Sequence, residues 1–261
     1  MDYIDIHGHY AWQLDDGIES LSEAKKALEK ASQDNIKTIV ATPHVNDLTT
    51  QQDIANIKMR IQELQTLASE YSIDVKIGCE LMINQNIEQR MKKNLFLPIE
   101  LTKYILCEYD VRHIDDDYFE NFDNYLLSLI TRDYIPVIAH VERYYQRDNL
   151  DLEFVQYLID MGCIIQINSS SLLHEGPFKN NAIQLLDHQL VHVIASDTHQ
   201  AKGVRYPNLD ECYHQLMKMG FDKQYLKLLF HENPQRIIED KYIIQPHFKK
   251  RSFIQKVLKN K

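Results

Sequence analysis

Short apolar runs, rich in valine and isoleucine, alternate along this chain with longer stretches in which apolar residues recur every three or four positions. The short runs predict β-strands, and the longer stretches predict amphipathic helices that bury one face. The seven predicted strands cover residues 4–9, 36–42, 74–79, 104–107, 135–139, 163–167 and 191–195. The predicted helices cover residues 21–31, 52–71, 85–93, 118–132, 208–219, 223–230 and 234–240.

This order of elements predicts an α/β fold with a parallel sheet, because nearly continuous apolar strands separated by helices are covered on both faces. Polar residues decide between an open sheet and a barrel. Ligand-type side chains follow most of the strands, as in a barrel, whereas an open sheet gathers its site at one crossover point. These side chains are His7, His9, His44, Glu80, Glu108, His140, Asp197 and His199, with Asp16 on the loop after the first strand.

Each of these nine residues has an ordinary explanation when it is taken alone, such as a helix cap or a hydrogen-bonded core histidine. Taken together, carboxylates and histidines at one end of a barrel would leave polar groups unpaired and charges in repulsion unless cations lay among them. Nine ligands exceed the needs of one ion, so we expect two or three ions. The mixture of imidazole and carboxylate suits Mn, Fe or Zn better than Ca or Mg.

Two metal ions at one site are typical of enzymes that displace a group from phosphorus, since they activate a bridging water and stabilise the equatorial oxygens. Such chemistry also needs cationic groups that hold the phosphate. Arg143 follows His140 by three residues, and Arg205 lies on the loop after His199. Both can offer two parallel N–H donors to a phosphate. We therefore expect attack by a metal-bridging hydroxide, with no covalent enzyme intermediate.

The composition narrows the class of protein further. The 261 residues carry a formal net charge of −9, and 44% of them are hydrophobic. One large domain is therefore feasible, and the acidic balance argues against nucleic acid as a partner. No apolar run is long enough to cross a bilayer, and the first residues show no leader pattern, so we expect a cytoplasmic protein.

The four cysteines, Cys79, Cys107, Cys163 and Cys212, are widely spaced, which is typical of buried thiols and not of a disulfide framework. A cysteine-dependent tyrosine phosphatase would carry an arginine at a fixed distance after its nucleophile. The residues at that distance are Gln85, His113, Ser169 and Lys218. This class of enzyme is therefore excluded.

The ligand-type residues stand in motifs that occur in the same order in one known group of proteins. The motifs are Asp5-Ile6-His7-Gly8-His9, Asp15-Asp16-Gly17, Thr42-Pro43-His44, Gly78-Cys79-Glu80, Glu108, Ile138-Ala139-His140-Val141-Glu142-Arg143-Tyr144, Asn168-Ser169-Ser170 and Ala195-Ser196-Asp197-Thr198-His199. This set resembles the polymerase and histidinol phosphatase (PHP) superfamily. It is most similar to the bacterial metal-dependent tyrosine-protein phosphatases of capsular and exopolysaccharide loci.

The resemblance implies a distorted seven-stranded (β/α)7 barrel with a trinuclear, manganese-dependent site. It implies that the enzyme dephosphorylates the tyrosine-rich tail of a bacterial tyrosine kinase and so regulates polysaccharide synthesis. By position, the first metal would be held by His7, His9, Glu80 and Asp197, the second by Glu80, Glu108 and His140, and the third by Asp16, His44 and His199. Arg143 and Arg205 would hold the phosphate.

Two stretches depart from that pattern and leave alternative functions open. The residues after His44 are Val45-Asn46-Asp47-Leu48, where family members commonly carry basic residues. The loop that carries Arg205 is one residue longer than the family pattern. One alternative is a small-molecule phosphoesterase of the same superfamily, similar to histidinol-phosphate phosphatase. Another is a non-enzymatic regulator of the kinase.

The C-terminal stretch differs in composition from the rest of the chain. We expect the phosphatase barrel to cover residues 1–244 and a basic tail to cover residues 245–261, which contain six lysines and arginines. Phe253, Ile254, Val257 and Leu258 are spaced to share one helical face. The tail is predicted to contact anionic lipid near the membrane or a second subunit in a homo-oligomer, and the alternative is a solvated chain end.

Overall fold

The computed structural model describes residues 1–109, 121–145, 150–248 and 251. The strands are β1 Tyr3–Gly8, β2 Ile36–Ala41, β3 His44–Val45, β4 Asp74–Ile77, β5 Glu80–Ile83, β6 Tyr104–Tyr109, β7 Ile135–Ile138, β8 Ile164–Asn168 and β9 Val193–Ala195. The helices are α1 Leu21–Gln33, α2 Gln51–Ser69, α3 Ile87–Lys92, α4 Phe122–Ile130, α5 Leu152–Asp160, α6 Ser169–Leu173, α7 Pro177–His188, α8 Leu209–Lys218, α9 Lys223–Lys227 and α10 Asn233–Ile238, with the short turns η3 Val141–Arg143 and η4 Leu228–Glu232.

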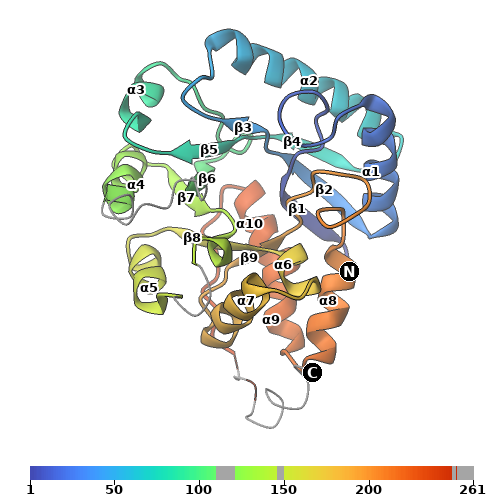
Figure 1. Cartoon of the computed structure of the whole chain (residues 1–261), viewed down its shortest axis with the longest axis vertical. Coiled ribbons are helices and arrows are strands. Elements are labelled where there is room, and N and C mark those ends of the chain that lie inside the picture. Colours follow the sequence, from blue (N-terminus) through green and yellow to red (C-terminus); the bar gives the residue numbers. More distant parts are fainter. Residues whose placement is uncertain (110–120, 146–149, 249–250, 252–261) are drawn as a thin grey trace.

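The fold is α/β, and the pairings between these strands are parallel. Three strands form one sheet in the order β1-β2-β4, and six form another in the order β3-β5-β6-β7-β8-β9. The prediction of a parallel α/β fold is confirmed. Figure 1 shows the helices arranged around the outside of the strands.

The second and third predicted strands, 36–42 and 74–79, correspond to β2 and β4. Each is followed after two residues by a short strand that was not predicted, β3 and β5, so the prediction of seven strands missed two in the described part of the chain. Pro43 separates β2 from β3, and proline has no N–H to donate to a sheet. Gly78 separates β4 from β5 at a close approach, where an added Cβ would lie 2.9 Å from Val40 Cγ1. As a result, Glu80 begins β5, and Glu108 lies within β6.

The first and last strands meet at their carboxyl ends. Asp197 N donates to His7 O at 2.9 Å, and His9 N donates to Thr198 O at 2.7 Å. A parallel bridge also joins Gly8 to Thr198. These bonds place the histidines at the end of β1 next to the residues after β9, although the two segments are far apart in sequence.

Helix α2 shows how the pattern of the sequence produces the packing. Its predicted apolar stripe is buried, and it contacts β4. The buried residues are Ile54, Ile57, Ile61, Leu64, Leu67 and Ala68. Thr50 caps its first turn, where the Asp53 N–H donates to the threonine side chain and the Asp53 side chain accepts from Thr50 N. The helix therefore begins at a fixed point, which fixes one end of the short connection that follows β3, the strand of His44.

The chain beyond β9 is helical as predicted, and α9, η4 and α10 follow one another without a break. The helix predicted at 118–132 is described only from residue 121, and α4 begins at Phe122. In the part of the chain that the structure describes, no helix is both long and apolar enough to cross a membrane.

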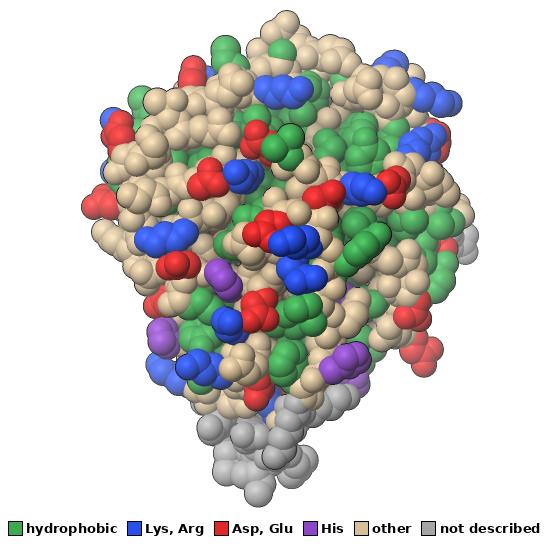
Figure 2. All heavy atoms as spheres, turned by 180° about the vertical axis from the view of Figure 1, so that it is seen from behind, with side chains coloured by type: hydrophobic (Ala, Val, Ile, Leu, Met, Phe, Trp, Pro, Cys, Tyr) green, Lys and Arg blue, Asp and Glu red, His purple; other side chains and the backbone are tan. Residues whose placement is uncertain are grey.

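The described residues of the predicted tail contact the body of the protein. Phe248 stacks on Tyr225 with ring centroids 5.3 Å apart, and Arg251 Nε donates to Asp187 Oδ1 at 2.9 Å. The predicted apolar face of the tail, residues 253–258, lies outside the described residues. The face seen in Figure 2 carries acidic and basic side chains interspersed over its surface.

Candidate metal centre

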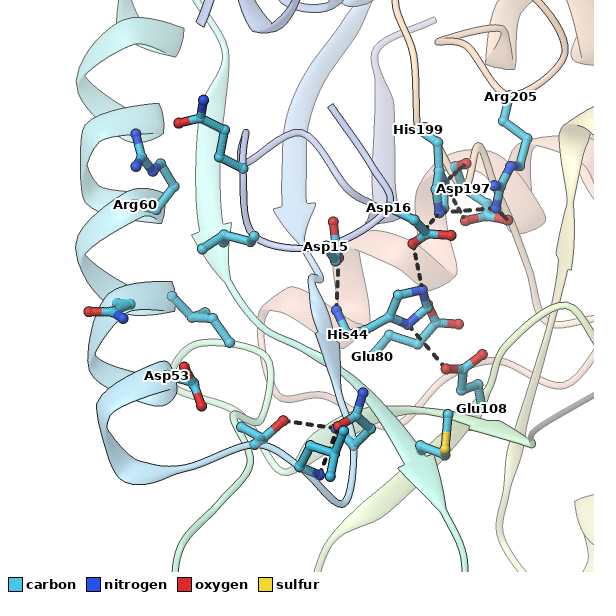
Figure 3. Close-up of a pocket in the computed structure, with 18 of the residues that line it drawn as sticks. Asp15, Asp16, His44, Asp53, Arg60, Glu80, Glu108, Asp197, His199 and Arg205 are labelled. Carbon is cyan, nitrogen blue, oxygen red and sulfur yellow. Dashed lines mark hydrogen bonds and ion pairs between the residues drawn. The ribbon is translucent and has the colours of Figure 1, made fainter. Parts of the chain in front are cut away.

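All nine ligand-type side chains converge on one centre, where β1, β7 and β9 end and where β3 and β5 begin. They come from seven separate positions around the sheets: the end of β1, the following loop, β3, β5, β6, and the segments after β7 and β9. Figure 3 shows His44, Glu80 and Glu108 directed at one another, with Asp16, Asp197 and His199 beside them. The structure thus brings together every metal ligand that the sequence predicted.

Glu80 lies at the centre of this group and is almost fully buried, with 1% exposure. Its Oε2 lies 3.1 Å from His9 Nε2 and 3.2 Å from both His7 Nε2 and His44 Nδ1. Its other oxygen, Oε1, lies 2.9 Å from His140 Nε2. One carboxylate therefore touches four imidazoles, which is the arrangement expected of a ligand that bridges metal ions.

Two of the other carboxylates contact His44. His44 Nε2 lies 3.2 Å from Asp16 Oδ1, and His44 Nδ1 lies 3.1 Å from Glu108 Oε1. Three groups have ligand atoms within 4.8 Å of one another: His9, Asp16, His44 and His199; His7, His9 and Asp197; and His44, Glu80 and Glu108. The groups share His9 and His44, so they form one continuous centre.

Two buried imidazole nitrogens lack a hydrogen-bond partner among the described residues, which fits a cation site. His7 Nε2 and His44 Nδ1 are buried and make no hydrogen bond to any described residue, although each lies near Glu80. Burial would lower the pKa of His44, but Glu80, Asp16 and Glu108 raise it to about 12. In the metal-free protein, protons thus balance the carboxylates. Divalent cations would supply this positive charge and displace those protons.

Two residues that the sequence analysis missed as site residues orient these histidines. Asp15 Oδ2 accepts from His9 Nδ1 at 2.7 Å and from the His44 backbone N–H at 2.9 Å. Gln166 Oε1 accepts from His7 Nδ1 at 3.1 Å and from the His140 backbone N–H at 3.0 Å. When Nδ1 carries the proton, Nε2 has its lone pair free for a metal.

The sequence contained a signal for the role of Gln166. Gln166 is a polar residue inside the apolar strand β8, and it is fully buried. Two positions later, Asn168 Nδ2 donates to Asp197 Oδ2 at 2.7 Å. A polar side chain on a buried strand must find a partner, and here the partners are the proposed ligands.

Backbone strain marks two of the strand ends. His140 has a φ of 35° and Asp197 a φ of 53°, and both lie in the left-handed region that side chains other than glycine rarely adopt. The buried carboxylate of Asp5 accepts from Ser196 N at 2.9 Å and so fixes the backbone just before Asp197. Such strain persists only where surrounding contacts hold it, and it is common at functional sites.

Gly17 allows the first loop to approach the centre. A Cβ at this position would lie 2.3 Å from His9 Cβ and 2.7 Å from His9 O. We expect Gly17→Ala to push the loop outward and displace Asp15 from His9, which should weaken metal binding by roughly 10- to 100-fold. Metal titration monitored by calorimetry would measure this loss, with the melting temperature as a control for folding. Unchanged metal affinity would contradict the role given to the loop.

Two arginines lie at the edge of the centre, as predicted. Arg143 Nη1 is 3.4 Å from Asp197 Oδ2, and Arg205 Nη1 is 3.6 Å from the same oxygen. Arg205 also donates to His199 Nε2 at 3.0 Å. Both arginine side chains are about one-third exposed and line two cavities that open beside the centre.

The first cavity, of about 870 Å³, extends from the centre toward α2, whose Asp53 and Arg60 appear at the side of Figure 3. The second cavity, of about 700 Å³, lies toward the start of α7. The two cavities share Asp16, Arg143, His199 and Arg205. The organic part of a phosphate ester held by the two arginines could therefore extend into either cavity.

Comparison with known proteins decides the family. A family model described as capsular polysaccharide synthesis, CpsB/CapC, matches residues 3–239. This chain belongs to the CpsB/CapC family. The resemblance stated from the motifs is thereby confirmed, and it extends over almost all of the described structure.

Named relatives in the CpsB/CapC family agree with this assignment. Tyrosine-protein phosphatase CpsB of Streptococcus agalactiae is 32% identical over 249 residues, covering 92% of this chain and 100% of that protein. Putative tyrosine-protein phosphatase CapC of Staphylococcus aureus is 33% identical, covering 88% of this chain and 86% of its own length. Tyrosine-protein phosphatase YwqE of Bacillus subtilis is 30% identical, covering 85% and 87%.

Solved structures place the fold in the same group. A structure from the study of YwqE from Bacillus subtilis and CpsB from Streptococcus pneumoniae, described as unique metal-dependent tyrosine phosphatases, has a TM-score of 0.81 and 27% identity. The match covers 93% of this chain and 97% of that one. A phosphotriesterase homology protein from Escherichia coli shares the fold alone, with a TM-score of 0.60 and 12% identity over 91% and 98% of the two chains.

Proposed function

We propose that this member of the CpsB/CapC family is a metal-dependent protein-tyrosine phosphatase that uses manganese. The observation that carries the proposal is the position of Arg143 and Arg205, both within 3.6 Å of Asp197 at the edge of nine ligand-type side chains. Phosphate clamps beside a multinuclear centre are what hydrolysis of a phosphate monoester requires. The naming of its relatives as tyrosine phosphatases supports the choice of substrate.

In this mechanism, the residues of the chain bind and orient the substrate. The metal ions, when bound, supply Lewis-acid charge and activate water. Arg143 and Arg205 donate hydrogen bonds to the non-bridging phosphate oxygens and stabilise the charge that develops on them. Asn168 holds Asp197 at 2.7 Å, so the carboxylate between the arginines keeps its position. The leaving phenolate has a pKa of about 10, so its departure does not demand a strong general acid.

We also propose that the nine strands of the described residues form a distorted barrel with seven strand positions. The support is that β2 and β3 are separated by only two residues, as are β4 and β5, so that each pair acts as one bent strand. The bridge from Gly8 to Thr198 supports closure between the first and last strands. In such a barrel, the carboxyl ends of all the strands meet around one site.

The physiological substrate that we propose is the phosphorylated, tyrosine-rich tail of a bacterial kinase that controls polysaccharide synthesis. Turnover of a phosphotyrosyl peptide should exceed turnover of histidinol phosphate by the same manganese-loaded preparation. The opposite preference would favour a small-molecule phosphoesterase. Absence of turnover of both would favour a non-enzymatic regulator. Contact of the C-terminal segment with anionic lipid or with a second subunit stays a prediction.

Chelation and thiol alkylation should have opposite effects on activity. All four cysteines are buried and free, and burial raises the pKa of Cys79 to about 12, so none supplies a thiolate nucleophile at neutral pH. We expect a chelator to abolish hydrolysis of p-nitrophenyl phosphate and added manganese to restore it. Iodoacetamide should leave the activity unchanged. Loss of activity on alkylation with full metal content would contradict the proposed mechanism, and comparison of Mn, Fe and Zn would identify the metal.

A further inference from the structure

The second cavity contains apolar surface that the chemistry at the metal centre does not use. Phe178, in the first turn of α7, is 37% exposed, and Val204, on the loop before Arg205, is 55% exposed. Both line the cavity together with Arg143 and Arg205. Exposed apolar side chains that face a cavity next to charged clamps are a means of holding the non-reacting part of a substrate.

Phe178 also lies at a suitable distance from the phosphate clamp. The Arg143 guanidinium carbon is 6.0 Å from the centroid of the Phe178 ring. A phosphate that accepts hydrogen bonds from Arg143 is attached directly to the ring of phosphotyrosine. Aromatic rings pack with centroids roughly 4.5–7 Å apart, so a tyrosyl ring extending from that phosphate into the second cavity can contact Phe178.

The first cavity offers a different surface. Among its described lining residues, the exposed apolar side chains are aliphatic, such as Leu48 with 86% exposure and Met59 with 52%. Of the described residues that line either cavity, Phe178 is the only phenylalanine, tyrosine or tryptophan. The cavity that carries an aromatic side chain beside the arginines is therefore the second one.

We propose that Phe178, together with Val204, forms the binding surface for the tyrosyl ring of the substrate and directs that ring into the second cavity. This proposal rests on the proposed phosphatase function and adds a residue that determines specificity. The phosphate remains at the metal centre and the arginines. The ring buries apolar area that is otherwise exposed, so an aromatic phosphate ester gains affinity that inorganic phosphate cannot gain.

Calorimetric binding to the full-length, manganese-loaded protein tests this directly. The two probes are phosphonomethyl-phenylalanine amide, which is a non-hydrolysable analogue of phosphotyrosine, and inorganic phosphate. We expect Phe178→Ala to weaken binding of the analogue by about tenfold, with unchanged binding of inorganic phosphate. Phe178→Tyr should restore the affinity, because it returns the ring. Leu48→Ala, which removes an exposed apolar side chain from the other cavity, is the matched control and should change neither affinity.

Equal weakening of both probes, or no weakening of either, would overturn the proposed role of Phe178. A larger effect of Leu48→Ala than of Phe178→Ala would also overturn it, since the ring would then enter the first cavity. Turnover of phosphotyrosine by the same wild-type preparation separates the two proposals. Binding that depends on Phe178 without turnover would overturn the phosphatase function alone, and turnover without such dependence would overturn the ring surface alone.

Discussion

Glu80→Ala should lose bound metal and phosphatase activity together. The buried carboxylate contacts four histidines within 3.2 Å, so its removal takes away the group that links the separate parts of the centre. We expect manganese content to fall and kcat/KM to drop by roughly a thousandfold, which corresponds to about 4 kcal/mol of transition-state stabilisation. Elemental analysis of the purified protein and hydrolysis of a phosphotyrosyl peptide would measure the two effects.

The control for this substitution is Glu29→Ala, which removes an exposed glutamate from α1, outside the site. It should change neither metal content nor rate. A thermal melt of both variants shows whether the fold survives. Removal of the buried Glu80 carboxylate leaves the neighbouring histidines without their counter-charge. We therefore expect some loss of stability even in a variant that folds. Full metal content in Glu80→Ala would contradict a bridging role.

Arg143→Ala should retain bound metal but bind phosphate less tightly. Its side chain is 29% exposed, and its Nη1 lies 3.4 Å from Asp197 Oδ2, an oxygen that also accepts from Asn168. Asp197 therefore keeps a hydrogen-bond donor when the arginine is removed, and the metal site should remain intact. We expect kcat/KM to fall by roughly a hundredfold, or about 2.7 kcal/mol, with a matching rise in the inhibition constant of inorganic phosphate.

Arg143→Lys distinguishes the shape of the clamp from its charge. Lysine keeps the positive charge but has no planar fork of donors, so it should recover only part of the activity. Full recovery would assign the residue a purely electrostatic role. An unchanged inhibition constant for phosphate in Arg143→Ala would contradict its assignment as a clamp.

Some features of the fold followed from local sequence because they depend on local periodicity. The stripe from Ile54 to Leu67 indicated which face of α2 would be buried, since residues three and four apart share one side of a helix. The two strands that were not predicted, β3 and β5, were signalled only by Pro43 and Gly78, which separate them from β2 and β4. A proline ends a ladder locally, but whether the strand resumes depends on the neighbours that pair with it.

The ligand types, and their gathering on one side of the fold, followed from the sequence, because parallel strands in an α/β fold direct their carboxyl ends to one side. The tertiary structure decided which of them touch. It placed Glu80 between four imidazoles, set Asp15 and Gln166 behind the histidines, and positioned Phe178 beside Arg143. Apart from the contact between Asp15 and His9, which are close in sequence, these contacts join segments far apart in the chain. They therefore follow from the packing of whole elements and not from any local pattern of residues.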